Sequence, residues 1–259
     1  MHSNGLQRQV EVHGASLDEI LQVIREAPLL EICSLTDISP PTADVSETII
    51  YHPHIRTLAL LEMRREVFTK IVNSLELPSL KSCSFSSDFP DTITGTDAVA
   101  FLKRFGSGLT TFELYHLQAP LFEDVKQLLQ AAPHLQRLNL DTYGDDSLSL
   151  VIDNILEHMS APPSLQIGDN ASFLSEIQRL EFRGSKLTAW ACIPLIFRWP
   201  HRKLFSLDIE TQPVIISDDL SKELVQLVDQ GIKLRIEDSS NGKNYLEMFR
   251  KRGILEATN

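Results

Sequence analysis

An α/β fold of about nine stacked strand-turn-helix units is predicted by three observations. A motif of the form apolar-x-x-apolar-x-apolar recurs, with its central apolar residue at positions 10, 33, 58, 83, 112, 138, 180, 207 and 234. Successive copies lie 23 to 29 residues apart, except for one interval of 42. Most intervals carry apolar residues at helical spacing. This period is typical of leucine-rich repeats, so we predict a solenoid with a curved parallel sheet on its concave face and helices on its convex face.

The motif itself predicts the strands. Side chains alternate between the faces of a strand, so the second and third apolar positions of each copy point into one core. The seven regular copies are centred on Cys33, Leu58, Cys83, Phe112, Leu138, Leu180 and Leu207. Degenerate copies centred on Val10 and Leu234 close the two ends.

A helix is predicted in most of the intervals. In the first, Ser16 and Glu19 have the spacing of a capping box, and apolar residues follow at helical spacing from Leu17 to Ile24. The same pattern predicts helices over 68–75, 98–105, 121–129, 148–159 and 220–228. Proline or glycine follows several of them, as at Pro28, Pro78 and Pro133, and sets the turn into the next strand.

A continuous array predicts a single domain over 1–259, with no linker to break it. The 42-residue interval contains a Pro/Gly/Ser-rich stretch, which predicts an irregular loop at about 160–173. Such a loop is either a tolerated surface insertion or a partner-binding segment. An amphipathic stretch at about 244–253 is expected to form a helix that caps the C-terminal end of the stack.

The composition limits which classes of partner and which cellular compartment we expect. The 24 basic and 35 acidic residues give a net charge of -11, which argues against nucleic acid or an anionic membrane as the main ligand. We find neither an apolar run long enough to span a bilayer nor a signal peptide, so we expect an intracellular protein of the cytoplasm or nucleus.

Residues that suggest chemistry are explained by the repeat. Cys33 and Cys83 occupy inward strand positions, and Cys192 lies in an apolar segment, so neither a disulfide framework nor a zinc site is indicated. His54 and His134 each precede the leading apolar residue of a motif. Because no nucleophile, acid, base or metal set is recognisable, we expect no catalytic residues, no cofactor and no enzyme activity.

The outward strand positions tile the concave face, where repeat proteins commonly bind partners. They are small or uncharged in the second to fourth copies and become charged from the fifth onward. The candidate partner-binding residues are Tyr115, Arg137, Asn139, Asp141, Arg179, Glu181, Arg183 and Asp208. Tyr and Arg are enriched in interface hot spots. The alternative is that the mixed charges form ordinary cross-strand pairs.

Three segments carry a family resemblance: APHLQRL at 132–138, APLLE at 27–31 and ELVQLVDQGIKLRI at 223–236. With them the chain resembles the repeat region of the large F-box protein family of mushroom-forming fungi. In that family an N-terminal F-box docks on the Skp adaptor of a cullin-based ubiquitin ligase, and the repeats present a substrate. No F-box pattern occurs here, since the repeats begin close to Met1, which suggests a fragment of a longer product.

The resemblance therefore implies a substrate-recognition scaffold for ubiquitin-dependent protein degradation, with an unknown protein substrate as its partner. Binding of the Skp adaptor is expected only if an F-box lies upstream in the full-length product, and no residue of this chain is assigned to it. The alternative function is a stand-alone leucine-rich-repeat protein that binds or inhibits a partner without ubiquitin chemistry.

Overall fold

The strands of the large parallel sheet appear at every predicted motif. A computed structural model describes residues 8–41, 49–86, 95–115, 122–141, 149–161, 174, 176–184, 186–202, 204–212 and 214–257. Within these ranges nine parallel strands are ordered β1-β2-β4-β6-β7 in one compact unit, residues 1–135, and β8-β9-β10-β11 in a second, residues 136–259. The predicted α/β class with a parallel sheet is confirmed. The predicted loop at 160–173 lies almost entirely outside the described residues.

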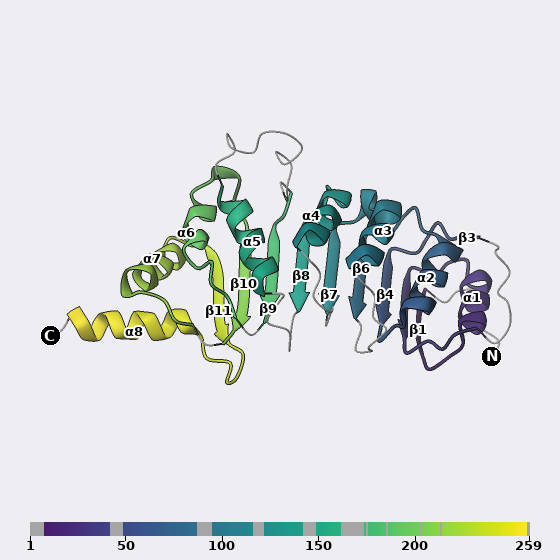
Figure 1. Ribbon diagram of the computed structural model, residues 1–259, viewed down its shortest axis with the longest axis horizontal. Helices are drawn as coiled ribbons and strands as arrows, with labels where there is room; N and C mark the ends of the chain where they lie inside the picture. The colour runs from purple at the N-terminus through teal and green to yellow at the C-terminus, as the bar shows by residue number, and fades with distance from the viewer. Residues whose placement is uncertain are drawn as a thin grey trace. The chain divides into compact units, whose positions relative to one another are not determined.

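The first unit alternates strands and helices. Its elements are β1 (Gln9–His13), α1 (Leu17–Glu26), β2 (Ile32–Thr36), β3 (Ile50–Tyr51), β4 (Thr57–Leu61), α2 (Arg65–Ser74), β5 (Leu75–Glu76), β6 (Ser82–Ser86), α3 (Gly95–Phe105), the 3-10 turn η1 (Gly106–Gly108), β7 (Thr111–Tyr115) and α4 (Phe122–Ala131). Strands β3 and β5 form a separate two-stranded parallel sheet. The helices lie along one side of the large sheet (Figure 1).

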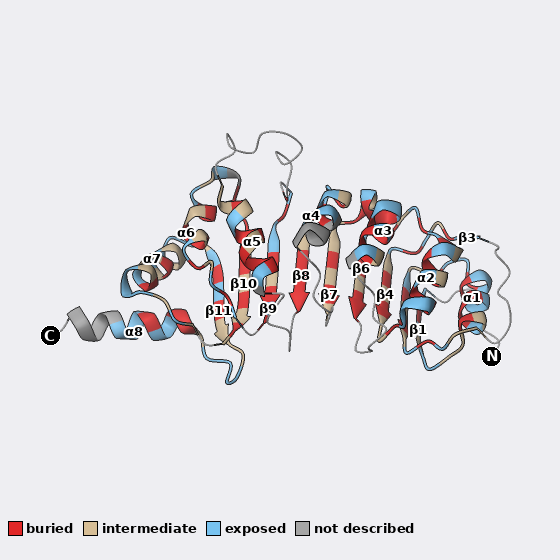
Figure 2. Ribbon diagram, in the orientation of Figure 1, coloured by how far each residue is buried: buried red, intermediate tan, exposed pale blue. Residues whose placement is uncertain are grey.

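The register places equivalent motif positions side by side. Cys33 pairs with Val10 on one side and Leu58 on the other, and Cys83 pairs with Leu58 and Phe112. Buried and partly exposed residues alternate along these strands (Figure 2). The buried set faces the helices, and the other set faces away from them. The motif therefore fixes both the pairing and the face of each side chain.

Backbone hydrogen bonds repeat with the same period. The carbonyls of Arg8, Glu31, Arg56 and Lys81 each accept two amides from the start of the next strand, at 2.8 to 3.1 Å. Gly14, Asp37 and Glu62 follow β1, β2 and β4 directly, and all three have positive φ. Only glycine adopts this left-handed conformation without cost, so Asp37 and Glu62 are held there by the structure around them. The repeat is thus a unit of backbone conformation as well as a sequence pattern.

Aromatic side chains fill the middle of the first unit. The ring of Phe85 lies 5.2 Å from that of Phe68, 4.8 Å from that of Phe101 and 5.5 Å from that of Phe112, each in an edge-to-face arrangement. These phenylalanines come from α2, β6, α3 and β7, and all four are fully buried. Their contacts join two helices to two strands, which explains why the helices cover one face of the sheet.

One helix end of the first unit differs from the prediction, and another agrees with it. The periodicity predicts a helix over 68–75, but α2 ends at Ser74, and Leu75 is extended and begins β5. The helix predicted over 98–105 does end at Phe105, and Gly106 follows in η1. A Cβ atom at Gly106 would lie 2.4 Å from the carbonyl oxygen of Ala131, so only glycine allows this close approach to the end of α4.

The second unit continues the alternation. Its elements are β8 (Arg137–Asp141), α5 (Ser149–Ser160), β9 (Arg179–Arg183), α6 (Cys192–Phe197), the 3-10 turn η5 (Pro200–Arg202), β10 (Ser206–Thr211), α7 (Asp218–Asp229), β11 (Lys233–Asp238) and α8 (Tyr245–Ala257). Leu180 pairs with Leu138 and Leu207, which in turn pairs with Leu234. Helix α6 is not among the predicted helices, whereas α8 lies where the C-terminal helix is expected and packs against α7 and β11.

Candidate interaction surface

The outward side chains of β8 to β11 form a surface on the side of the strands away from the helices. We call this surface the open face. Its members are Arg137, Asn139, Asp141, Arg179, Glu181, Arg183, Ser206, Asp208, Glu210, Lys233, Arg235 and Glu237. Because the strands are in register, residues of one row lie directly beside each other across the sheet, as Asn139, Glu181, Asp208 and Arg235 do.

The charges of the open face form a ladder of ion pairs. Arg137 Nη2 and Arg179 Nε lie 2.7 and 2.8 Å from the same oxygen, Oε1 of Glu181. Arg179 Nη2 lies 3.7 Å from Asp208 Oδ2, and that oxygen is also 3.3 Å from Arg235 Nη1. The ladder therefore runs without a break across the four strands, with alternating signs at contact distance.

Two further ion pairs lie on the open face, one between β9 and β10 and one along β11. Arg183 Nε lies 3.2 Å from Glu210 Oε2, and Arg235 Nη2 lies 2.6 Å from Glu237 Oε2. Partial desolvation opposes the charged form of Arg235, yet Glu237 and Asp208 together raise the pKa of this guanidinium above its usual value. The cross-strand pairs that the sequence offers as an alternative to a binding surface are therefore present.

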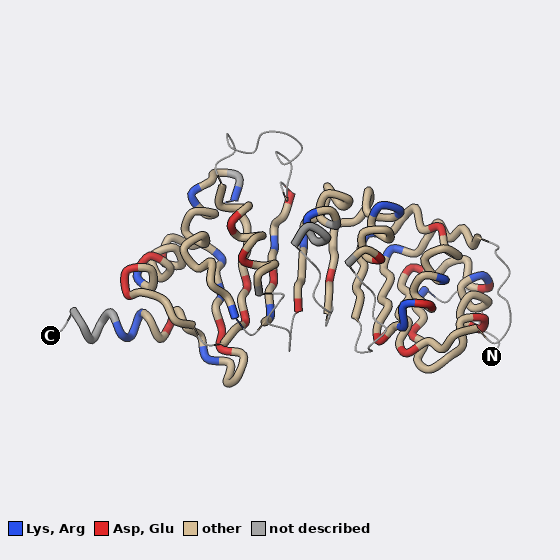
Figure 3. Tube along the Cα trace, viewed as in Figure 1, with Lys and Arg blue, Asp and Glu red and all other residues tan. Residues whose placement is uncertain are grey.

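The basic and acidic side chains of the open face differ in how far they are exposed to solvent. The side chains of Arg137, Arg179 and Arg183 are 42, 46 and 51 % exposed. Their partners Glu181, Asp208 and Glu210 are 13, 20 and 29 % exposed. The carboxylates therefore lie low in the ladder and the guanidinium groups lie outermost. Basic and acidic residues both occur along these strands (Figure 3). A molecule that approached the open face would meet arginine first.

Three other candidate residues are placed differently. Asn139 and Asp141 occupy outward positions of β8 but are more than nine-tenths buried, so the structure does not offer their side chains to solvent. Tyr115 belongs to β7 in the first unit, where its hydroxyl donates a hydrogen bond of 2.9 Å to Glu113 Oε2. The structure thus brings Arg137, Arg179, Glu181, Arg183 and Asp208 together at the surface, whereas Asn139 and Asp141 lie in the same rows but are covered.

Cys33, Cys83 and His52, whose residue types could suggest catalysis or metal binding, are buried in the protein core. Cys33 and Cys83 are fully buried, and burial raises the pKa of the Cys33 thiol to about 12. The imidazole of His52 is buried too, with Nε2 3.0 Å from the Ala27 carbonyl oxygen. Within the described ranges no group of three or more His, Cys, Asp and Glu side chains is placed to hold a metal ion.

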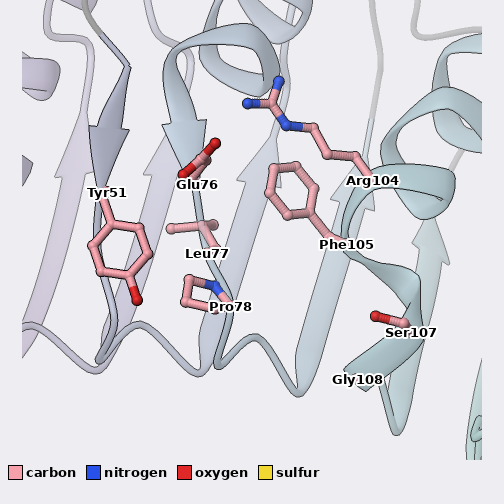
Figure 4. A pocket seen from close by; sticks show the side chains of 8 residues that line it. All are labelled: Tyr51, Glu76, Leu77, Pro78, Arg104, Phe105, Ser107 and Gly108. Atoms are coloured by element: carbon pink, nitrogen blue, oxygen red, sulfur yellow. The ribbon is translucent and has the colours of Figure 1, made fainter.

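A concave feature of the first unit was missed by reasoning from the sequence. It is a groove of about 250 Å³ between β5 and the end of α3, with Tyr51, Glu76 and Phe105 on its walls (Figure 4). These three residues occupy one repeat position, seven residues before the motif centres at Leu58, Cys83 and Phe112. An alignment of the turns as well as of the strands would have drawn attention to them.

Comparison with known proteins identifies neither a family nor a relative of this chain. No protein-family model matches the chain, and no curated protein is significantly similar to it. No helix in the described part of the chain is both long enough and apolar enough to cross a membrane.

Proposed function

We propose that this chain is a non-catalytic leucine-rich-repeat scaffold that binds a protein partner through the open face. The observation that carries the proposal is the layering of the ladder, in which half-exposed guanidinium groups lie above largely covered carboxylates. Paired carboxylates hold each arginine in place, so little side-chain entropy is left to lose on binding. A partner would pair its own carboxylates or carbonyl oxygens with the exposed guanidinium groups of Arg137, Arg179 and Arg183.

The leucine-rich-repeat assignment is supported by the periodic backbone. In the first unit the strands recur with one period, and equivalent motif positions pair with each other. Carbonyl groups that each accept two amide hydrogen bonds recur with the same period. In the second unit the Gln136 carbonyl likewise accepts the amides of Gln178 and Arg179 at 2.8 and 3.0 Å. Such units bury their apolar residues only by stacking, which leaves an extended sheet face for recognition.

We further propose that the partner is a substrate for ubiquitin transfer and that this chain is the substrate-recognition region of an F-box protein. The support is the resemblance of the segments at 27–31, 132–138 and 223–236 to the fungal F-box family. Co-purification of the full-length gene product with the Skp adaptor would support this role. A full-length product that fails to bind the adaptor would favour a stand-alone binding or inhibitor protein.

The open face is tested by charge reversal. The double variant Arg137→Glu with Arg183→Glu should lose its partners in affinity capture followed by mass spectrometry, because two of the three outermost cations become anions. The control is Arg25→Glu with Lys251→Glu, which makes the same charge change at exposed helix positions. Arg183→Gln removes one charge without adding repulsion and should give partial loss. Unchanged capture by the double variant would reject the open face as the binding surface.

A further inference from the structure

The groove of the first unit has an apolar floor between two aromatic rings. Leu77 and Pro78 form the floor, and the rings of Tyr51 and Phe105 stand on either side of it (Figure 4). Leu77 and Phe105 are buried, whereas Tyr51 is 62 % exposed. The volume of about 250 Å³ is below the ~300–1,000 Å³ of typical small-molecule sites. It suits one or two residues of a peptide better than a cofactor.

The charged groups at the groove are not paired with each other. The guanidinium of Arg104 donates from Nη1 to the Val72 carbonyl oxygen at 2.9 Å and lies over the Phe105 ring, with Cζ 5.3 Å from its centroid. Among the described residues no carboxylate forms an ion pair with Arg104, and the side chain of Glu76 makes neither a hydrogen bond nor an ion pair. This contrasts with the open face, where the arginines of the ladder have acidic partners. Arg104 therefore keeps donors in a geometry suited to a carboxylate.

A strand edge also faces the groove. Among the described strands β5 pairs with β3 alone, and the His52 amide donates to the Glu76 carbonyl oxygen at 2.9 Å. Since backbone groups of alternate residues point to opposite edges of a strand, the amide of Leu77 points away from β3, toward the groove. Within the described part of the chain this amide has no hydrogen-bond partner. An unpaired edge beside an apolar floor is the arrangement that accepts an added strand.

We propose that this groove binds an extended segment of a protein partner that contains an apolar residue and, two positions away on the same face of the strand, an acidic one. The segment lies along β5 as an added strand and accepts a hydrogen bond from the Leu77 amide. Its apolar side chain rests on Leu77 and Pro78 between the two rings, and its carboxylate pairs with Arg104. Glu76 repels a second acidic side chain and so sets the direction of the segment. The site lies within the first unit and is independent of the function proposed for the open face.

The test is a selection from a displayed library of random heptapeptides on the intact chain. We expect the selected peptides to carry Asp or Glu two positions from an apolar residue. Peptides made individually should bind the Arg104→Glu variant about tenfold or more weakly in fluorescence polarisation, as expected on loss of a charge-assisted pair. The Tyr51→Ala variant, changed at an exposed ring, should also weaken binding. Selection on Arg104→Glu should shift the preference toward Lys or Arg, a reversal that general damage to the fold would not produce.

Lys103→Glu is the matched control, because it makes the same charge change one residue away on α3 and should leave peptide affinity within about twofold. The open-face variant Arg137→Glu with Arg183→Glu should also bind the peptides normally. The proposal is overturned if no acidic preference emerges on the unmodified chain. It is equally overturned if the selected peptides bind Arg104→Glu and Tyr51→Ala as tightly as the parent.

Discussion

Asp153 caps the turn that begins at Thr188, 35 residues further along the chain. Its Oδ1 accepts hydrogen bonds from the amides of Thr188 and Ala189 at 2.9 and 2.8 Å, and its Oδ2 accepts one from the Thr188 hydroxyl. Asp153 is 6 % exposed, so these bonds replace almost all of its contact with water. The carboxylate thereby fixes the chain that leads from β9 into α6 against helix α5.

Substitution of Asp153 by Ala should lower the free energy of unfolding by about 1–3 kcal/mol, because it leaves the amides of Thr188 and Ala189 and the Thr188 hydroxyl without their acceptor. Asp153→Asn keeps one acceptor oxygen and should fall between Ala and the parent. Urea denaturation followed by circular dichroism measures both. Glu157→Ala, at an exposed position of the same helix, is the control and should change stability by less than about 0.5 kcal/mol. Equal effects at the two positions would contradict the role assigned to Asp153.

Phe85→Ala should destabilise the first unit by about 3–5 kcal/mol, because Phe85 is the ring that contacts Phe68, Phe101 and Phe112. Phe85→Leu retains most of the buried volume and should cost less. The measurement is again chemical denaturation. Leu29→Ala removes a partly exposed apolar side chain in the same unit and should have only a small effect. A small loss for Phe85→Ala would mean that the four rings do not form one core.

The strands were predictable because their inward positions are repeated without exception. A side chain at Cys33 or Leu180 must be apolar to stand in the core, and the spacing then fixes the strand. Helix α6 was missed because its residues are apolar on nearly all sides and include Pro194, so no amphipathic period is visible. Leu75 was placed in a helix because its buried side chain fits the helical period, although its backbone is extended.

The candidate surface was only partly predictable. The strand period identifies which residues face outward, and so it placed Arg179 and Glu181 on one face. It does not show which of them pair, because pairing depends on side-chain rotamers across strands that are far apart in the sequence. Nor does it show that Asn139 is covered. The groove at Arg104 depends on how two turns approach each other. The spacing of apolar residues in the strands does not predict that approach.

The capping box at the start of α1 leads to a pH-dependent prediction. Glu19 Oε2 accepts the Ser16 amide at 3.0 Å, and this bond, with a second one from the Ser16 hydroxyl, lowers the pKa of the Glu19 carboxyl from its usual 4.5. A carboxyl whose pKa is lower in the folded state stabilises that state above its unfolded pKa. The contribution should therefore be present at neutral pH and disappear as the pH falls through the folded pKa.

Titration of side-chain carboxyl resonances by NMR measures this shift directly. The pKa of Glu19 should rise toward its usual value in Ser16→Gly, which removes the hydroxyl, although the backbone amide bond remains and should preserve part of the shift. Glu19→Gln should remove the corresponding acid dependence of stability. A Glu19 pKa at or above 4.5 in the parent chain would show that the capping box is not formed in solution.

The three cysteines should differ sharply in reactivity. Burial raises the pKa of the Cys33 thiol to about 12, and burial together with the nearby charge of Glu113 raises the pKa of Cys83 well above its usual value. Cys192 is only partly buried. Because the thiolate is the reactive form, Cys33 and Cys83 should be inert toward Ellman's reagent in the folded chain at mildly alkaline pH, and one thiol should react first.

That first thiol should be Cys192, and Cys192→Ser should abolish the rapid phase while leaving two slow thiols that react fully in urea. The slow rate should report the opening of the strands that carry Cys33 and Cys83, since both side chains are fully enclosed in the native state. The Phe85→Ala variant should accelerate labelling of Cys83, its neighbour on β6, more than that of Cys33 on β2. Rapid labelling of Cys33 or Cys83 in the unmodified chain would contradict their placement at inward strand positions, and with it the register that aligns Cys33, Leu58 and Cys83.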